Sequence, residues 1–227
     1  MSWSLQELQN QIASEMDQSA TAPTAGGTDW SIRLNALNRA LFDWGESYDW
    51  RALLKVHNGV ISTASANASY ALPSDFRKLD GFPLITWDGV NTDQFTPVDA
   101  TKNTQYIDTD KYVNILGNDR DGKVLYIHTS TLASGASIQF TYWKSPQSLA
   151  SATNLTECPD PTFLVQRSLY YLYKGREDGR FPEAKVESDR ILARMIENEN
   201  TLGQAHSDNR VHNWNETRYS FKIGRDG

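Results

Sequence analysis

Residues 112–127, YVNILGNDRDGKVLYI, carry the clearest structural signal in the chain. Two runs rich in aliphatic and aromatic residues, 112–116 and 123–127, flank the polar, glycine-containing segment 118–122. Such runs joined by a short turn are typical of a β-hairpin. Residues 137–143, SIQFTYW, alternate apolar and polar side chains and predict a third strand with one buried face.

Weaker strand signals lie upstream of this hairpin. Residues 70–72 run into Pro73, which indicates a strand that ends in a turn. Residues 84–87 precede Asp88-Gly89, a pair that readily adopts the positive φ angles of a tight turn, so a second strand is expected to resume at Val90. Several short strands at this spacing predict an antiparallel β-sandwich or barrel-like domain over residues 51–157.

The amino-terminal residues have the pattern of two helices. Ser4 and Glu7 have the spacing of a capping box, and apolar residues follow at helical steps at Leu5, Leu8, Ile12 and Met16. A flexible connection is predicted for residues 19–27. The second helix is expected to be capped by Thr28 or Asp29 and to end near residues 45–48.

Helical patterns return after the strands. Asp160 is placed to cap a helix that has Pro161 in its first turn, and Pro182 is placed to open a last helix that ends near Gly203. Residues 218–223, RYSFKI, then alternate like a strand. The sequence thus predicts an α+β fold. It would consist of a helical bundle formed by residues 1–50 and 158–205, an inserted β domain (51–157) and an extended C-terminal tail (206–227).

Composition excludes several classes of protein. The 227 residues include 22 Lys and Arg against 28 Asp and Glu, a net charge of −6. This balance argues against a protein that holds nucleic acid by neutralising phosphates. The single cysteine, Cys158, excludes an internal disulfide framework and a cysteine-built zinc site. We predict no cofactor, no metal, no membrane span and no secretory signal.

Catalytic motifs are weak. Segment 118–122 has the oxygen density of a calcium loop but lacks the distal bidentate glutamate, so a hairpin turn is favoured. Segment 176–180 could hold an acid/base pair, although a charge-paired turn between helices is favoured. Cys158 has no nucleophile signature, and the histidines have no metal-ligand spacing; they are His57, His128, His206 and His212. We therefore predict that the protein is not an enzyme, with a carboxylate-based hydrolase as an alternative.

Aromatic residues make up 11% of the chain, which fits a β-rich core or broad contact surfaces. Helix packing is favoured for Tyr170, Tyr171 and Tyr173. Core packing or subunit contact is favoured for Trp87 and Trp143, while stacking on sugar rings, as in a carbohydrate-binding β module, is the alternative. The aromatic end of the chain is either a disordered terminus or a segment that adds to the sheet edge of a partner.

Two stretches support a family resemblance. Residues 69–79, SYALPSDFRKL, resemble the Y-x-L-P-x-D-F segment of head–tail adaptor (connector) proteins of tailed bacteriophages. Residues 158–161, CPDP, and 180–184, RFPEA, look like the closing helical pair of those adaptors. The order of elements over residues 28–205 is similar to that of the podovirus tail tubular protein A type. The predicted extended tail departs from adaptors that end in a long helix.

The resemblance implies a structural virion protein that assembles in the host cytoplasm and is located in the neck or tail of the particle. Adaptors of this kind form a closed ring of about twelve copies with heterologous interfaces. The ring lies between the portal and the tail or nozzle, and DNA passes through its lumen without specific binding. We expect the C-terminal segment to bind the portal through Trp214, Arg218, Tyr219, Phe221 and Ile223.

Overall fold

The computed structural model describes residues 2–19, 21–61, 67–99, 111–118, 121–129 and 132–219, with residues 67 and 202–219 described by their backbone alone. The chain divides into two compact units. The helical unit comprises Met1–Arg51 and Ser148–Gly227, and the β unit comprises Ala52–Gln147. The predicted mixture of helices and mainly antiparallel strands is confirmed.

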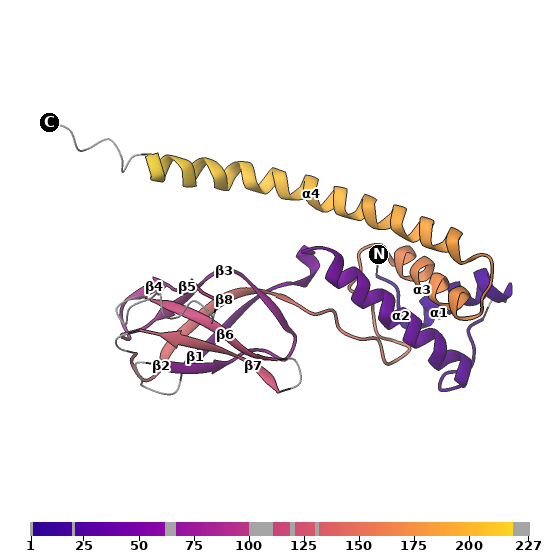
Figure 1. Cartoon of the computed structure of the whole chain (residues 1–227), viewed down its shortest axis with the longest axis horizontal. Coiled ribbons are helices and arrows are strands. Elements are labelled where there is room, and N and C mark those ends of the chain that lie inside the picture. The colour runs from indigo at the N-terminus through magenta and orange to yellow at the C-terminus, as the bar shows by residue number, and fades with distance from the viewer. Residues whose placement is uncertain are drawn as a thin grey trace. The chain divides into compact units, whose positions relative to one another are not determined.

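The helical unit contains α1 (Leu5–Asp17), α2 (Thr28–Ser47), α3 (Pro161–Gly175) and α4 (Phe181–Tyr219). Helix α3 contacts each of the other three, and α4 lies along it (Figure 1). The apolar positions of α3 are nearly all buried, as its sequence predicts. Residues 148–157, which the sequence places with the strands, are instead bound to α1. The Leu5 amide donates to the Asn154 carbonyl at 2.8 Å, and the Thr156 amide donates to the Trp3 carbonyl at 2.9 Å.

Three of the four predicted helix starts are confirmed, including that of α4, which has Pro182 in its first turn. Ser4 and Glu7 form the capping box of α1, and the Asp160 side chain accepts from the Thr162 amide at the start of α3. The expected cap of α2 is wrong, because its N-cap is Gly27 and no side chain caps it. The preceding turn, closed by a Gly27 amide to Thr24 carbonyl bond of 3.0 Å, allows the helix to begin at Thr28 itself.

The C-terminal part of the chain corrects the sequence-based prediction. Helix α4 continues to Tyr219, so the helix does not end near Gly203 and residues 206–219 are not extended. Residues 220–227 lie outside the described part of the chain. A single glycine costs a helix only about 1 kcal/mol, and no proline follows Pro182 to end it. With 39 residues, α4 is about 58 Å long, whereas the 15 residues of α3 span about 22 Å.

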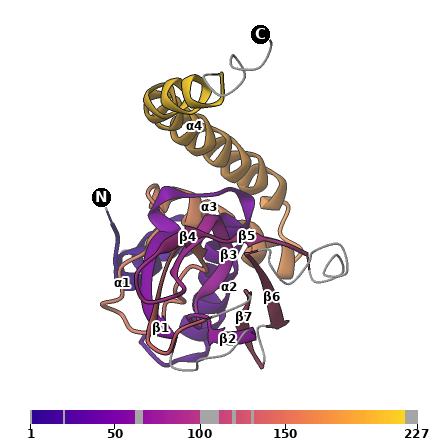
Figure 2. The ribbon, with the colours of Figure 1, turned by 90° about the vertical axis from the view of Figure 1, so that its left-hand side faces the viewer.

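The β unit contains two four-stranded sheets (Figure 2). A short helix, η1 (Arg51–Leu53), leads into the first strand. The first sheet has the order β1 (Leu54–Ile61), β8 (Ala136–Lys144), β3 (Phe76–Thr86) and β4 (Thr92–Gln94). The second has the order β2 (Asn67–Ala71), β7 (Gly122–His128), β6 (Tyr112–Asn118) and β5 (Thr96–Pro97). All pairs are antiparallel except β5 with β6.

The main strand predictions are confirmed. The central hairpin is β6–β7, with Asn118 opposite Gly122, and residues 137–143 lie in β8. After Asp88-Gly89 the chain re-enters the sheet at Thr92 rather than Val90. The reason is that the Asp88 carboxylate accepts from the amides of Val90 and Asn91 and holds a wider loop.

A closed barrel is not formed by the described strands. The strands β4 and β5 are only three and two residues long, too short to join the two sheets into one. Buried side chains from both sheets nevertheless form a single hydrophobic cluster, which includes Ile61, Phe76, Ile85, Phe95, Leu125, Ile127, Ile138 and Phe140. This cluster is the core of the β unit.

Candidate functional site

The segment that carries the family resemblance points into the core of the β unit. Phe76 is 3% exposed, and its ring stacks on Tyr142 at 5.6 Å between centroids. Tyr70 extends from β2 so that its hydroxyl lies 2.7 Å from His57 Nε2 on β1. The first contact lies within one sheet and the second joins the two sheets, so the aromatic residues of the segment stabilise the fold.

The acidic residue of the same segment, Asp75, also stabilises the fold. The Asp75 carboxylate accepts from Lys55 Nζ and from the Tyr142 hydroxyl, each at 2.8 Å. Burial opposes ionisation of Asp75, but these two hydrogen bonds together lower its pKa. Burial and the same bond raise the pKa of Tyr142 to about 12. The charge of Asp75 is thus used to hold β1 and β8 at the start of β3.

The two tryptophans considered for sugar stacking do not form one platform. Trp143 is opposite Lys78 on β3, whereas the Trp87 carbonyl, just after β3, accepts from the Ala133 amide before β8. They lie at opposite ends of this strand pair. The pairing of Ile85 with Ile138, extended by two residues, places Trp87 beside Ala136, and the seven residue steps from there to Trp143 span about 24 Å. The ring of Trp87 is also engaged, because Lys111 Nζ lies 4.0 Å from its centroid and its indole nitrogen donates to Asp93.

The residues considered for catalysis have structural partners. Asp178 binds Arg180 at 2.7 Å, and the hydrogen bond from Arg180 lowers the pKa of Asp178 to about 2. A carboxyl group with this pKa does not act as a general acid near neutral pH. Burial raises the pKa of the Cys158 thiol, which keeps the sulfur protonated and unreactive.

Among the described residues, the histidines and the acidic turn at 118–122 have separate partners and do not form one site. His128 is bound to Asn114 through Nε2 at 2.7 Å. The Asp121 amide donates to the Asn118 side chain, as in an ordinary turn, while residues 119 and 120 lie outside the described chain. His206 and His212 lie in the part of α4 that is described by backbone alone. Within the described residues no three His, Cys, Asp or Glu side chains are grouped to hold a metal ion.

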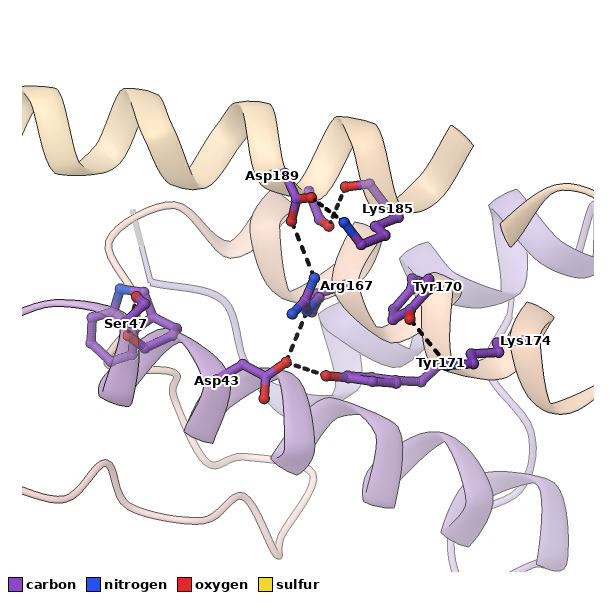
Figure 3. Close-up of polar contacts among 10 residues, drawn as sticks. Asp43, Ser47, Arg167, Tyr170, Tyr171, Lys174, Lys185 and Asp189 are labelled. Carbon is purple, nitrogen blue, oxygen red and sulfur yellow. Dashed lines mark hydrogen bonds and ion pairs between the residues drawn. The ribbon is translucent and has the colours of Figure 1, made fainter. Parts of the chain in front are cut away.

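A polar network links α2, α3 and α4 (Figure 3). One oxygen of Asp43, on α2, accepts from Arg167 Nε at 2.8 Å and from the Tyr171 hydroxyl, both on α3. Arg167 also donates to Asp189 on α4 at 3.2 Å, and Lys185 binds the other oxygen of Asp189. Burial and the bond to Asp43 raise the pKa of Tyr171, so its hydroxyl remains a donor at neutral pH.

Beside this network lies a group of cations and aromatic rings. The Arg39 guanidinium lies 4.0 Å from the centroid of the Tyr171 ring. The rings of Tyr170 and Tyr171 are 5.1 Å apart, and Lys174 Nζ lies 5.7 Å from the centroid of Tyr170. Both tyrosines are half-buried, whereas Arg39 and Lys174 are exposed. The sequence assigns these tyrosines to helix packing and gives no sign of the cations that surround them.

A cavity of about 280 Å³ lies between α1, α3 and α4 and is lined in part by Trp3, Glu15 and Val165. Its two cations are already paired. Arg190 binds Glu187 and Arg194 binds Asp160, each at 2.6 Å. Among the described residues that line it, the cavity therefore offers no unpaired cation to a ligand.

Comparison with known proteins identifies the family. The SU10 adaptor protein family matches residues 3–214, which is nearly the whole chain. The chain belongs to the SU10 adaptor protein family. No curated protein matches it. For this adaptor, the predicted relation to phage head–tail adaptors is confirmed at the level of the family, while the podovirus tail tubular type stays a prediction.

The match extends from α1 to the last turns of α4 and includes both units. Of the residues predicted to bind the portal, Trp214, Arg218 and Tyr219 lie on α4, and Phe221 and Ile223 lie outside the described residues. Their role stays a prediction. Among the described helices, none combines the length and apolar character needed to span a membrane.

Proposed function

We propose that this SU10-family adaptor is a structural, non-enzymatic virion protein that forms a ring of about twelve copies between the portal and the tail or nozzle. The observation that carries the proposal is the family match over residues 3–214. The internal role of Tyr70, Asp75 and Phe76 supports it, because the most recognisable segment of the chain builds a scaffold rather than a ligand site.

The charge of the chain suits a conduit for DNA. Its net charge is −6, and many of the described cations are bound to carboxylates, including Arg33 with Asp17 and Arg51 with Glu199. A protein with few unpaired cations releases few counterions on contact with DNA and therefore holds it weakly. DNA would slide through a ring of such subunits rather than adhere to it.

The end of α4 is the element we propose for contact with the portal. Helix α4 is 39 residues long and α3 is 15, so about three fifths of α4 exceeds the length of α3. The part of a helix that extends past its packing partner in its own chain is available for contact with another chain. Trp214, Arg218 and Tyr219 would then contact the portal from the last helical turns, with Phe221 and Ile223 beyond them.

Imaging of the purified protein mixed with its cognate portal rings tests the function. We expect an added ring of density, coaxial with the portal, and loss of that density when residues 206–227 are deleted. Persistent binding by the deleted chain would remove the role of α4 but keep the adaptor function. Absence of binding by the full chain would contradict the adaptor function itself. The separation of Trp87 and Trp143 gives no support to the carbohydrate-binding alternative.

A further inference from the structure

The edges of the two sheets in the β unit differ in length. Among the described strands, the edges are β1 and β4 in the first sheet and β2 and β5 in the second. Strand β1 has eight residues, whereas β2, β4 and β5 have five, three and two, and β5 ends in Pro97. Natural edge strands are often short or carry a proline, because their outer N–H and C=O groups can pair with another chain. Of these four edges, β1 offers by far the longest row of such groups.

Strand β1 also lacks other features that protect an edge. It pairs with β8 from Leu54 to Ile61 without a shift of register, so no bulge interrupts this strand. Apart from His57, its ionisable side chain is Lys55, which is bound to the Asp75 carboxylate at 2.8 Å. The outer edge of β1 is therefore regular and nearly uncharged, and it forms no ladder with any other described strand.

The exposed face of β1 has the same order of side chains in both directions. Side chains alternate along a strand, so Val56, Asn58 and Val60 lie on one face. Val56 is 62% exposed, Val60 is 63% exposed, and Asn58 between them is exposed as well. In an antiparallel pair of such strands centred on Asn58, each Val56 lies opposite a Val60 and the two asparagines lie opposite each other. Centring on His57 would instead place Val56 against Asn58.

We propose that β1 binds β1 of a second copy of this chain, antiparallel and centred on Asn58. The first sheets of the two copies then form one continuous sheet across a two-fold axis. Apolar side chains meet apolar ones on its exposed face, and amide meets amide. A two-fold contact is complete in a pair, whereas the repeated contact of a ring is heterologous. The pairing therefore lies outside the proposed ring and belongs to the unassembled protein.

The size of the contact sets its strength. Eight residues of strand are about 27 Å long, and one strand of each copy takes part. Such a contact is smaller than the roughly 1,600 Å² of a standard interface, so we expect a weak dimer that depends on concentration. Weak pairing covers the edge in the free protein, where it would otherwise be open to unrelated strands, and releases the subunits for assembly.

Two substitutions on the exposed face test the pairing and its register in the full-length protein. Sedimentation velocity over a range of concentrations measures the dimer. We expect V56K, and separately V60E, to weaken it by on the order of tenfold, because each change alters two pairs across the two-fold axis. The variant V56K/V60E should restore the dimer, since each new lysine then lies opposite a new glutamate. V90K places the same lysine at an exposed turn of the β unit and should dimerise like the unaltered chain.

A cysteine on the two-fold axis gives a second measurement. In N58C the two thiols lie opposite each other across the strand pair, so mild oxidation should join two copies. The matched control is D80C, which places an exposed cysteine on β3 of the same sheet and should cross-link far more slowly. Cys158 is buried and does not compete. Circular dichroism confirms that each variant is folded.

Several outcomes would contradict self-pairing of β1. A monomer at every concentration, with N58C oxidised no faster than D80C, would show that the two strands do not meet. A dimer that V56K leaves unchanged would place the contact elsewhere, and a V56K/V60E variant that stays monomeric would exclude the register centred on Asn58. If N58C reacts only after residues 220–227 are deleted, the C-terminal segment of the chain covers the edge instead.

Addition of portal rings separates this pairing from the proposed function. V56K should still form rings on the portal, because β1 pairs before assembly. Loss of those rings in V56K, or cross-linking of N58C to the portal protein, would assign β1 to the assembled particle and contradict the pairing of free subunits. If dimers form but the unaltered chain binds no portal rings, the pairing stands and the proposed adaptor function fails.

Discussion

One set of aromatic residues in each unit shows how strongly the neighbours of a ring decide its role. In the β unit, Phe76, Phe140 and Tyr142 are at most 3% exposed and contact one another's rings. On α3, Tyr170 and Tyr171 are half-buried and lie among cations. The residue type is the same, but the neighbours differ. The apolar neighbours of the first set show that these rings stabilise the fold, whereas Tyr170 and Tyr171 lie partly at the surface of the helical unit.

The largest expected effect is the loss of a core ring. Phe76→Ala should reduce the free energy of unfolding of the β unit by about 4 kcal/mol, because the site is buried and cannot collapse fully. Tyr170→Ala should cost less than about 1 kcal/mol in the helical unit, since its ring is half-exposed. Chemical denaturation of both variants measures the difference. Equal losses would contradict the distinction between the two sets of aromatic residues.

Gly59, on β1, faces Tyr70 and provides a second test of aromatic packing in the β unit. A Cβ atom at Gly59 would lie 1.9 Å from the Tyr70 hydroxyl oxygen and 2.5 Å from Cζ. Gly59→Ala should therefore displace the ring, break its bond to His57 and cost about 2 kcal/mol. Thermal unfolding measures the loss.

The control for this glycine is Gly175→Ala, where no atom lies within 4 Å of the added carbon and stability should change little. In a Tyr70→Ala background the cost of Gly59→Ala should largely disappear, because the clash is gone. A full cost in that background would show that the strain comes from the backbone of β1 instead.

Local patterns predicted much of this fold from the sequence. The capping box at Ser4 and the hairpin at 112–127 depend on residues close in sequence, so short-range rules describe them. The end of α4 was missed because six alternating residues resemble a strand when nothing shows what they pack against. The contacts of Arg39 with Tyr171 and of Asp43 with Arg167 join residues more than a hundred positions apart. No local pattern indicates such contacts.

Removing the central charge of the polar network between α2 and α3 should have a smaller effect on stability. Asp43→Asn removes the charge that accepts from both Arg167 and Tyr171, and we expect a loss of about 1–2 kcal/mol. Asp189→Asn is the matched control, since that side chain is about half exposed and its ion pairs should contribute well under 1 kcal/mol. Urea denaturation compares the two. If Asp189→Asn costs as much, the network depends on α4 rather than on the link between α2 and α3.

The smallest effect concerns pH and the interior of the β unit. His128 stacks on Tyr112 at 4.1 Å between centroids, and burial lowers its pKa. Since Asn114 donates through its nitrogen to the Val98 carbonyl, its oxygen faces His128 and accepts from Nε2. The proton gained on acidification therefore enters at Nδ1.

Above the unfolded pKa of about 6.5 both folded and unfolded chains hold this histidine neutral, and it contributes no dependence on pH. Below that value the unfolded chain binds the proton first, so the free energy of unfolding decreases as pH falls. Urea unfolding of the unaltered chain and of His128→Gln at pH 7 and pH 5 measures this contribution. The unaltered chain should lose more stability between the two values than the variant does. An equal loss in both would mean that His128 is protonated as readily in the folded β unit as in the unfolded chain. The surroundings of His128 would then be more exposed to solvent than its stacking on Tyr112 indicates.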